Sequence, residues 1–144
     1  AKYGVGLAIE NMIDNKPLRR FAGNAEDLME LTDRLGDDEL FGICWDTGHA
    51  NLNAIDQPAA IRQIGGRLRS LHVNDNHGKT DDHTLPFLGT VDWLGVMHAL
   101  HDIGYQGDFT YEIHRFTDGF TPEYHQQAVR FSYETAEYML TLLK

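Results

Sequence analysis

Short apolar stretches alternate with longer amphipathic stretches along the whole chain. Four of the apolar stretches have the length of buried strands, and they cover residues 3–9, Phe41–Trp45, Leu68–Val73 and Phe109–Ile113. The segments between them carry the signals that begin and end helices. Because strands separated by helices normally pair in parallel through right-handed crossovers, this alternation predicts an α/β fold.

The predicted helices have recognisable boundaries. Asn24 caps a helix over residues 25–35 that Gly36 ends, and Pro58 opens one over 58–64 that ends at Gly65-Gly66. Asp92 caps a helix over 93–103, and Thr121-Pro122 opens the last helix. Spacings of three and four residues predict one packing face on that last helix, formed by Tyr124, Ala128, Phe131, Thr135, Tyr138 and Leu142.

The resulting order is β-α-β-α-β-α-β-α in 144 residues, without an internal linker. Four such units form half of an eight-stranded TIM barrel, which needs more than about 200 residues. The chain begins Ala1-Lys2-Tyr3 and enters an apolar segment almost at once. We therefore expect one domain over residues 1–144 that is a piece of a longer chain. Two open sheet edges lead us to expect that an isolated half pairs with a second copy.

Charge and composition narrow the class of protein. Twelve Lys and Arg face 22 Asp and Glu, a formal charge of −10, which argues against nucleic acid and anionic membranes as partners. The single cysteine, Cys44, sits in an apolar run and is expected to fill the core. One cysteine and no long apolar segment favour a cytoplasmic location.

Metal-ligand residues follow each of the four predicted strands or lie at its end. They are Glu10, Asp46, His72 and Glu112. The carboxyl ends of parallel strands converge on one side of a barrel, and three adjacent carboxylates are costly unless a dication neutralises them. The sequence therefore predicts a divalent metal site, with the two glutamates also placed to act as general acid and base.

Further polar residues surround these four. His49 follows Asp46 by three residues, and His83 lies in the long predicted loop 74–91. Asp75 is read either as a residue that orients a ligand imidazole or as a turn residue. His49, His83, Trp45 and Lys79 are our candidates for substrate contacts. Core packing remains open for Trp45, and Lys79 and Arg115 are either a phosphate site or solvated loop charges.

The motifs together resemble a known family. Ile-Glu-Asn (9–11), Trp-Asp-Thr-Gly-His-Ala-Asn (45–51), Leu-His-Val-Asn-Asp-Asn (71–76), Asp-Asp-His-Thr-Leu-Pro-Phe-Leu-Gly-Thr-Val-Asp-Trp (81–93) and Tyr-Glu-Ile (111–113) resemble the xylose isomerase-like TIM barrel superfamily. The resemblance spans the chain and corresponds to strands five to eight of the family barrel.

That resemblance implies a metal-dependent sugar or sugar-phosphate isomerase or epimerase. It implies that Glu10, Asp46, His72 and Glu112 bind one divalent ion (Mn, Co, Mg or Zn). It also implies that Glu10 and Glu112 transfer protons through an enediolate and that His49 contacts the substrate. The same superfamily contains endonuclease IV-type enzymes for abasic sites, whose zinc ligands would correspond to Asp46, His49, His72, Asp81, His83 and Glu112. A catalytically inert half-barrel is the third alternative.

Overall fold

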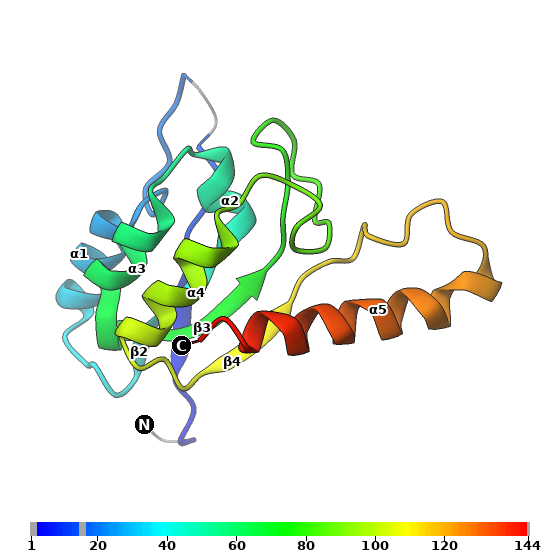
Figure 1. Ribbon diagram of the computed structural model, residues 1–144. Coiled ribbons are helices and arrows are strands. Elements are labelled where there is room, and N and C mark those ends of the chain that lie inside the picture. The colour runs from blue at the N-terminus through cyan, green and yellow to red at the C-terminus, as the bar shows by residue number, and fades with distance from the viewer. Residues whose placement is uncertain (1–2, 15–16, 144) are drawn as a thin grey trace.

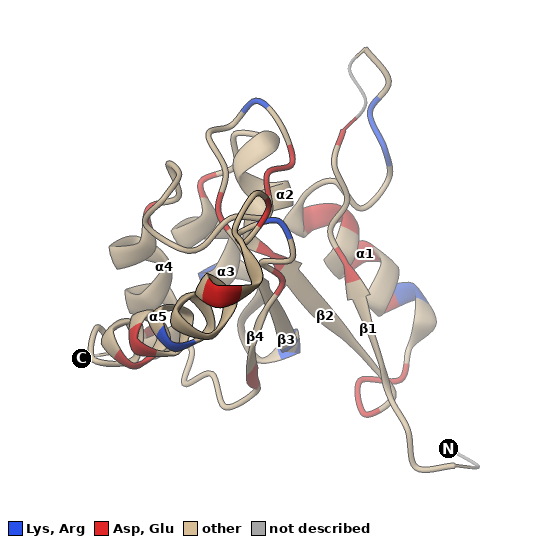
Figure 2. Ribbon diagram, turned by 90° about the vertical axis from the view of Figure 1, so that its right-hand side faces the viewer, with Lys and Arg blue, Asp and Glu red and all other residues tan. Residues whose placement is uncertain are grey.

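Four parallel strands form one sheet in the order in which they occur along the chain. The computed structural model describes residues 3–14 and 17–143, so Ala1 and Lys2 lie outside the described residues. The strands are β1 (Leu7–Glu10), β2 (Phe41–Asp46), β3 (Leu68–Val73) and β4 (Asp108–Tyr111), and the sheet order is β1-β2-β3-β4. The predicted α/β fold is confirmed, and all four carboxyl ends lie at one edge of the sheet (Figure 2).

Helices cover one face of this sheet. They are α1 (Ala25–Leu35), α2 (Thr47–Leu52), α3 (Gln57–Ile64), α4 (Trp93–Asp102) and α5 (Pro122–Leu140), with a short 3-10 helix, η1 (Gly65–Arg67), before β3. Figure 1 shows α1, α3 and α4 side by side, while α5 begins away from the body and runs back toward it. No helix in the described part of the chain is both long and apolar enough to cross a membrane.

The core lies between the sheet and this helical layer. Ile43 and Trp45 of β2 and Leu71 of β3 are at most 1% exposed, and they pack with Leu28 and Ile61 from the helices. Each such side chain contributes about 1.5–3 kcal/mol through burial. Cys44 is buried as expected, and burial raises the pKa of its thiol to about 11. Trp93 is also buried, at the start of α4.

Gly42 makes room for an irregularity in the sheet. Ile43 pairs with Leu68 and Cys44 with Ser70, so the pairing of β2 with β3 skips Arg69. A Cβ atom on Gly42 would lie 2.1 Å from Arg69 Cγ, which only glycine can accommodate. The Arg69 side chain therefore passes close over β2, where its guanidinium donates a hydrogen bond to the Asp38 carbonyl.

One burial prediction is wrong and a second holds only in part. The first strand was expected to be buried over residues 3–9, but β1 begins at Leu7, which is 61% exposed, and it pairs only with β2. On α5 the predicted packing face is covered only in part. Ala128 and Thr135 are buried, but Tyr124, Phe131 and Tyr138 are more than half exposed. A sequence pattern shows which residues could pack together, but not which neighbouring element is there to cover them.

Candidate metal centre

The four predicted ligands lie together at the carboxyl edge of the sheet. Glu10 ends β1, Asp46 ends β2, His72 is the penultimate residue of β3, and Glu112 directly follows β4. Each offers one ligand atom within 4.8 Å of those of the other three. These four residues are called the metal cluster below. The four residues thus lie together, as their places at the ends of successive strands predicted.

His72 occupies the centre of the metal cluster. Its Nδ1 lies 3.1 Å from Glu10 Oε1, 3.2 Å from Glu112 Oε2 and 4.0 Å from Asp46 Oδ2. One imidazole nitrogen thus faces three carboxylates that come from three different strand ends. The two glutamates approach it from opposite edges of the four-stranded sheet.

The three carboxylates of the metal cluster differ in their exposure to solvent. Asp46 is completely buried, whereas the side chains of Glu10 and Glu112 are 29% and 37% exposed. A buried carboxylate can hold an ion but cannot exchange protons with a substrate in the open site. Glu10 and Glu112 are accessible for that exchange.

Asp46 is held firmly by its neighbours. Its Oδ1 accepts a hydrogen bond from the His49 backbone N–H at 2.7 Å, which caps α2, and Oδ2 accepts one from Asn74 Nδ2 at 2.9 Å. Burial raises the pKa of Asp46 to about 6, an effect that Glu10 reinforces and His49 opposes. The carboxylate is thus preorganised but electrostatically uncompensated.

The metal cluster has the donor set and the charge that a divalent cation requires. In residues 3–14 and 17–143, no Lys or Arg pairs with any of its three carboxylates. Glu112 Oε2 is buried and makes no hydrogen bond, even though His72 lies close to it. Three carboxylate oxygens and an imidazole nitrogen suit several divalent metals, and an ion would resolve both the repulsion and the unsatisfied atom.

Two further histidines approach the metal cluster. His49 is 8% exposed, and its Nδ1 lies 2.8 Å from the Asn11 carbonyl oxygen and 3.4 Å from Glu10 Oε1. His83 is 6% exposed, with Nδ1 2.8 Å from the Glu112 carbonyl oxygen and Nε2 3.0 Å from Asp81 Oδ2. Burial alone would lower the His83 pKa, but these bonds outweigh it and raise the pKa.

His83 is also conformationally unusual. Its φ of 44° is a left-handed conformation that residues other than glycine rarely adopt, and its ring lies 4.2 Å from that of His114 between centroids. His49, Asp81 and His83 form a second group with ligand atoms within 4.8 Å, and His83, Glu112 and His114 form a third. Strain of this kind persists where surrounding contacts fix a functional group.

The structure corrects the interpretation of Trp45 and favours the turn alternative for Asp75. Trp45 is completely buried and bonds through its indole N–H to Gln57, which lies on α3, so it faces the helical layer and cannot touch a substrate. Asp75 does not orient an imidazole. It accepts hydrogen bonds from the backbone of Phe87 and Val91 and from the Trp93 indole, and thereby anchors the loop after β3. Lys79 lies exposed on that same loop.

Amide side chains that support the metal cluster were not predicted. Asn11 bonds twice to the backbone of Asp46, and Asn74 bonds to its carboxylate. Their positions beside strand-end acids were the available signal, but asparagine at a strand end is equally typical of a turn. The short helix α2 was also missed, because Asp46 was interpreted as a metal ligand and not as the N-cap of a helix.

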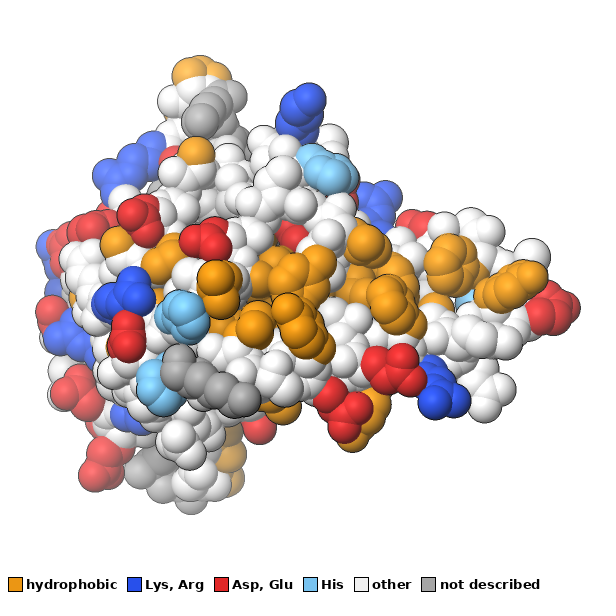
Figure 3. All heavy atoms as spheres, in the orientation of Figure 1, with side chains coloured by type: hydrophobic (Ala, Val, Ile, Leu, Met, Phe, Trp, Pro, Cys, Tyr) orange, Lys and Arg blue, Asp and Glu red, His pale blue; other side chains and the backbone are white. Residues whose placement is uncertain are grey.

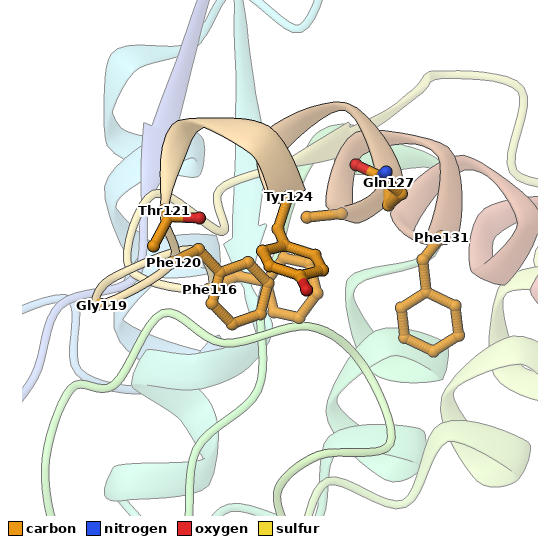
Figure 4. Close-up of a pocket in the computed structure, with 8 residues that line it drawn as sticks. Phe116, Gly119, Phe120, Thr121, Tyr124, Gln127 and Phe131 are labelled. Carbon is orange, nitrogen blue, oxygen red and sulfur yellow. The ribbon is translucent and has the colours of Figure 1, made fainter.

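An apolar hollow of about 540 Å³ lies away from the metal cluster, between the segment after β4 and the first half of α5 (Figure 4). Phe116, Phe120, Tyr124 and Phe131 line it, and none of its lining residues is acidic, basic or a histidine. The residues that line this hollow therefore offer no carboxylate or imidazole for metal binding or proton transfer.

Comparison of sequences shows the family of the chain and several of its relatives. Residues 1–135 match the family described as "Xylose isomerase-like TIM barrel". An uncharacterised protein, y4fM, of Sinorhizobium fredii is 31% identical over 75% of the chain and 33% of its own length. A D-psicose 3-epimerase of Enterocloster bolteae is 31% identical over 62% of the chain and 29% of its own length. The chain thus spans about a third of each of these relatives.

Solved structures share the fold. A D-tagatose 3-epimerase-like protein superposes with a TM-score of 0.78 at 23% identity, covering 99% of this chain and 49% of its own. The IolI protein with a bound zinc atom superposes with a TM-score of 0.70 at 21% identity. The match covers 99% of this chain and 50% of the IolI chain. The four strands and their helices therefore correspond to half of such a TIM-barrel chain. This protein belongs to the xylose isomerase-like TIM barrel family.

Proposed function

We propose that this chain supplies the metal site and the acid–base pair of a sugar isomerase or epimerase. The observation that carries the proposal is the metal cluster, in which two accessible glutamates flank a histidine and a buried aspartate. Its relatives include proteins named as sugar 3-epimerases, which supports a sugar as the small-molecule substrate. Because the chain spans only part of those relatives, the activity is proposed for the whole protein that contains it.

Glu10, Asp46, His72 and Glu112 would hold one divalent ion, Mn, Co, Mg or Zn. The uncompensated carboxylates and the unsatisfied Oε2 of Glu112 support this assignment, as does the zinc atom in the structurally similar IolI protein. Bound there, the ion would polarise the substrate carbonyl and its neighbouring hydroxyl. Asp46, buried and fixed by His49 and Asn74, would serve only as a ligand.

Glu10 and Glu112 would divide the proton transfers. One carboxylate removes the proton from the carbon beside the carbonyl, and the electron pair of that C–H bond forms the carbon–carbon double bond of an enediolate. The other, as a carboxylic acid, returns a proton to the opposite face of the same carbon in epimerisation, or to the neighbouring carbon in isomerisation. Glu10 ends β1 and Glu112 follows β4, the two edge strands of the sheet, which supports a two-sided transfer.

His49 would bind a substrate hydroxyl through Nε2, and His83 would border the substrate while it holds Asp81 in place. His49 Nε2 lies 3.8 Å from Asp81 Oδ2, and His83 is fixed by Asp81 and by the Glu112 carbonyl. These residues therefore form a polar wall beside the metal cluster. Such a wall could orient a polyhydroxylated chain while the two glutamates act on one of its carbons.

Proton exchange with solvent tests the proposal. The whole protein, loaded with Mn²⁺ and incubated with D-tagatose or D-psicose in D₂O, should incorporate deuterium beside the carbonyl. Glu10→Gln and Glu112→Gln should each remove this incorporation by at least about a hundredfold, because an amide cannot act as a base. The surface variant Glu30→Gln serves as control. Wild-type incorporation in both site variants would refute the acid–base roles.

An abasic-site endonuclease of the endonuclease IV type is the second candidate. The observation that favours it is the group His49, Asp81 and His83, which could hold another ion. The charge of −10 opposes a DNA partner. Three zinc ions per protein with cleavage of abasic DNA would support the nuclease, whereas one ion without cleavage supports the epimerase. A folded protein that binds no metal would support the third alternative, the inert half-barrel.

A further inference from the structure

A polar cavity of about 560 Å³ opens between the loops that follow β3 and β4. Its lining comes from His77, Lys79, Thr80, Asp82, Thr84 and Leu88 on the first loop and Arg115 on the second. The same two loops carry residues of the site, since Asp81 and His83 follow Thr80, and Glu112 precedes Arg115. The contact of His83 with His114 joins the loops at this point.

The cations of this cavity lack strong partners, although the chain is acidic. Lys79 forms no ion pair with any residue that the structure describes. Arg115 has only Asp118, at 3.7 Å, and the two side chains are 58% and 69% exposed. Exposed pairs of this kind contribute little. By contrast Arg62, Arg67 and Arg130 each form an ion pair at 2.8 Å or less.

Asp82, the one acidic residue that lines the cavity, accepts hydrogen bonds from residues of its own loop. Asp82 Oδ1 accepts a hydrogen bond from the Thr80 hydroxyl at 2.5 Å, and Oδ2 accepts one from the His77 backbone N–H at 3.4 Å. Asp82 thus shapes the turn that presents Lys79 and is not paired with either cation. Two positive side chains from separate loops are left facing one cavity of molecular size.

One residue of the cavity is close along the chain to the metal cluster. Arg115 is three residues from Glu112, so their Cα atoms are separated by at most about 11 Å. That distance suits a sugar whose carbonyl lies at the metal cluster and whose far end carries an anionic group. Lys and Arg from two loops are suitable ligands for phosphate or carboxylate oxygens.

We propose that this cavity binds the anionic terminus, phosphate or carboxylate, of a sugar substrate, and that Lys79 and Arg115 are its specificity-determining residues. The assignment of the ligand as a substrate rests on the proposed isomerase or epimerase function. The oxyanion site itself does not, because it is formed by residues outside the metal cluster. The two can therefore fail separately.

Isothermal titration calorimetry with inorganic phosphate tests the site directly. The protein is studied both loaded with Mn²⁺ and after EDTA treatment, so that phosphate bound to the metal is distinguished from phosphate in the cavity. We expect saturable binding in both states. Lys79→Gln and Arg115→Gln should each weaken it about tenfold, whereas Lys79→Arg and the control Arg62→Gln should change it less than about twofold.

Competition then identifies the source of the oxyanion. A ketose phosphate and a sugar acid are compared with an uncharged ketose for displacement of phosphate, and the stronger competitor names the terminus. Absence of phosphate binding to the EDTA-treated protein, or binding unaffected by both charge-removing variants, would overturn the inference. Metal content measured on the same samples separates the outcomes. A protein that binds metal but not phosphate refutes only the oxyanion site. A protein that binds phosphate but no metal refutes only the proposed function.

Discussion

Asn11 and Asp46 exchange two hydrogen bonds across the ends of β1 and β2. Asn11 Nδ2 donates to the Asp46 carbonyl at 2.9 Å, and the Asp46 N–H donates to Asn11 Oδ1 at 2.6 Å. Both residues are fully buried. The side chain of one residue thus replaces the sheet pairing that would otherwise continue beyond Glu10, and it fixes the backbone of a proposed metal ligand.

Replacement of Asn11 by alanine should therefore impair both folding and metal binding. Two buried backbone groups of Asp46 would lose their partners, which should lower the free energy of unfolding by about 2 kcal/mol or more. Metal affinity should fall about 10–100-fold, as for other outer residues that orient ligands. Urea unfolding and metal titration measure the two effects.

Asn24→Ala is the matched control for this variant. Asn24 caps α1 by accepting a hydrogen bond from the Asp27 N–H, so its loss should cost about 1 kcal/mol of stability. It lies outside the metal cluster and should leave metal affinity unchanged. Equal loss of affinity in both variants would show that general destabilisation, rather than the bonds to Asp46, is responsible.

Gly48→Ala should disrupt the support of Asp46 from the other side. A Cβ atom there would lie 1.8 Å from Asn74 Oδ1, and Asn74 is the residue that donates to Asp46 Oδ2. Alanine has a higher helix propensity than glycine, so this substitution should otherwise stabilise α2. A net loss of stability would therefore come from the steric clash. We expect about 1–3 kcal/mol of destabilisation and weaker metal binding. Gly66→Ala, with no atom within 4 Å of the new Cβ, should show neither.

The sequence located the residues of the metal cluster but not the residues that support them. Glu10, Asp46, His72 and Glu112 could be found because parallel strands necessarily bring their carboxyl ends together. Asn11 and Asn74 could not, because their role depends on side-chain direction across neighbouring strands. Trp45 was assigned to the wrong face, although it precedes Asp46 in a strand whose successive side chains point to opposite sides.

The pH should control metal affinity through Asp46. Burial raises the pKa of this carboxyl to about 6 in the metal-free protein, so protons compete with the metal below that value. Lowering the pH from 7 to 5 should weaken binding about tenfold through this group. Isothermal titration at a series of pH values checks the effect, and a constant affinity across this range would contradict it.

The same shift affects the stability of the metal-free fold with a definite sign. Between the ordinary value of 3.8 and about 6, the folded state holds the Asp46 proton more tightly than the unfolded state does. The contribution of Asp46 to stability therefore decreases as the pH rises through this window. Asp46→Asn should remove that decrease, as measured by urea unfolding of EDTA-treated protein at pH 4.5 and 7. An unchanged pH slope in the variant would assign the decrease to other groups.

Exposed apolar side chains gather over α4 and α5 (Figure 3). Leu94 and Tyr138 are 53% and 56% exposed, and Tyr138 contacts the exposed Phe87 at 5.7 Å between ring centroids. We predict that the 144-residue chain self-associates through this surface, since apolar patches favour association. The double variant Leu94→Lys/Tyr138→Lys should shift light scattering toward the monomer, whereas Leu18→Lys should not. A monomeric wild type at micromolar concentration would refute the prediction.

Metal analysis of the purified protein tests the central claim most directly. We predict one divalent ion bound through Glu10, Asp46, His72 and Glu112, and a loss of affinity of at least about a hundredfold in Asp46→Ala and in His72→Ala. His101→Ala, an exposed histidine on α4, should bind metal as the wild type does. Metal content that is unchanged in both ligand variants would contradict the assignment of this site.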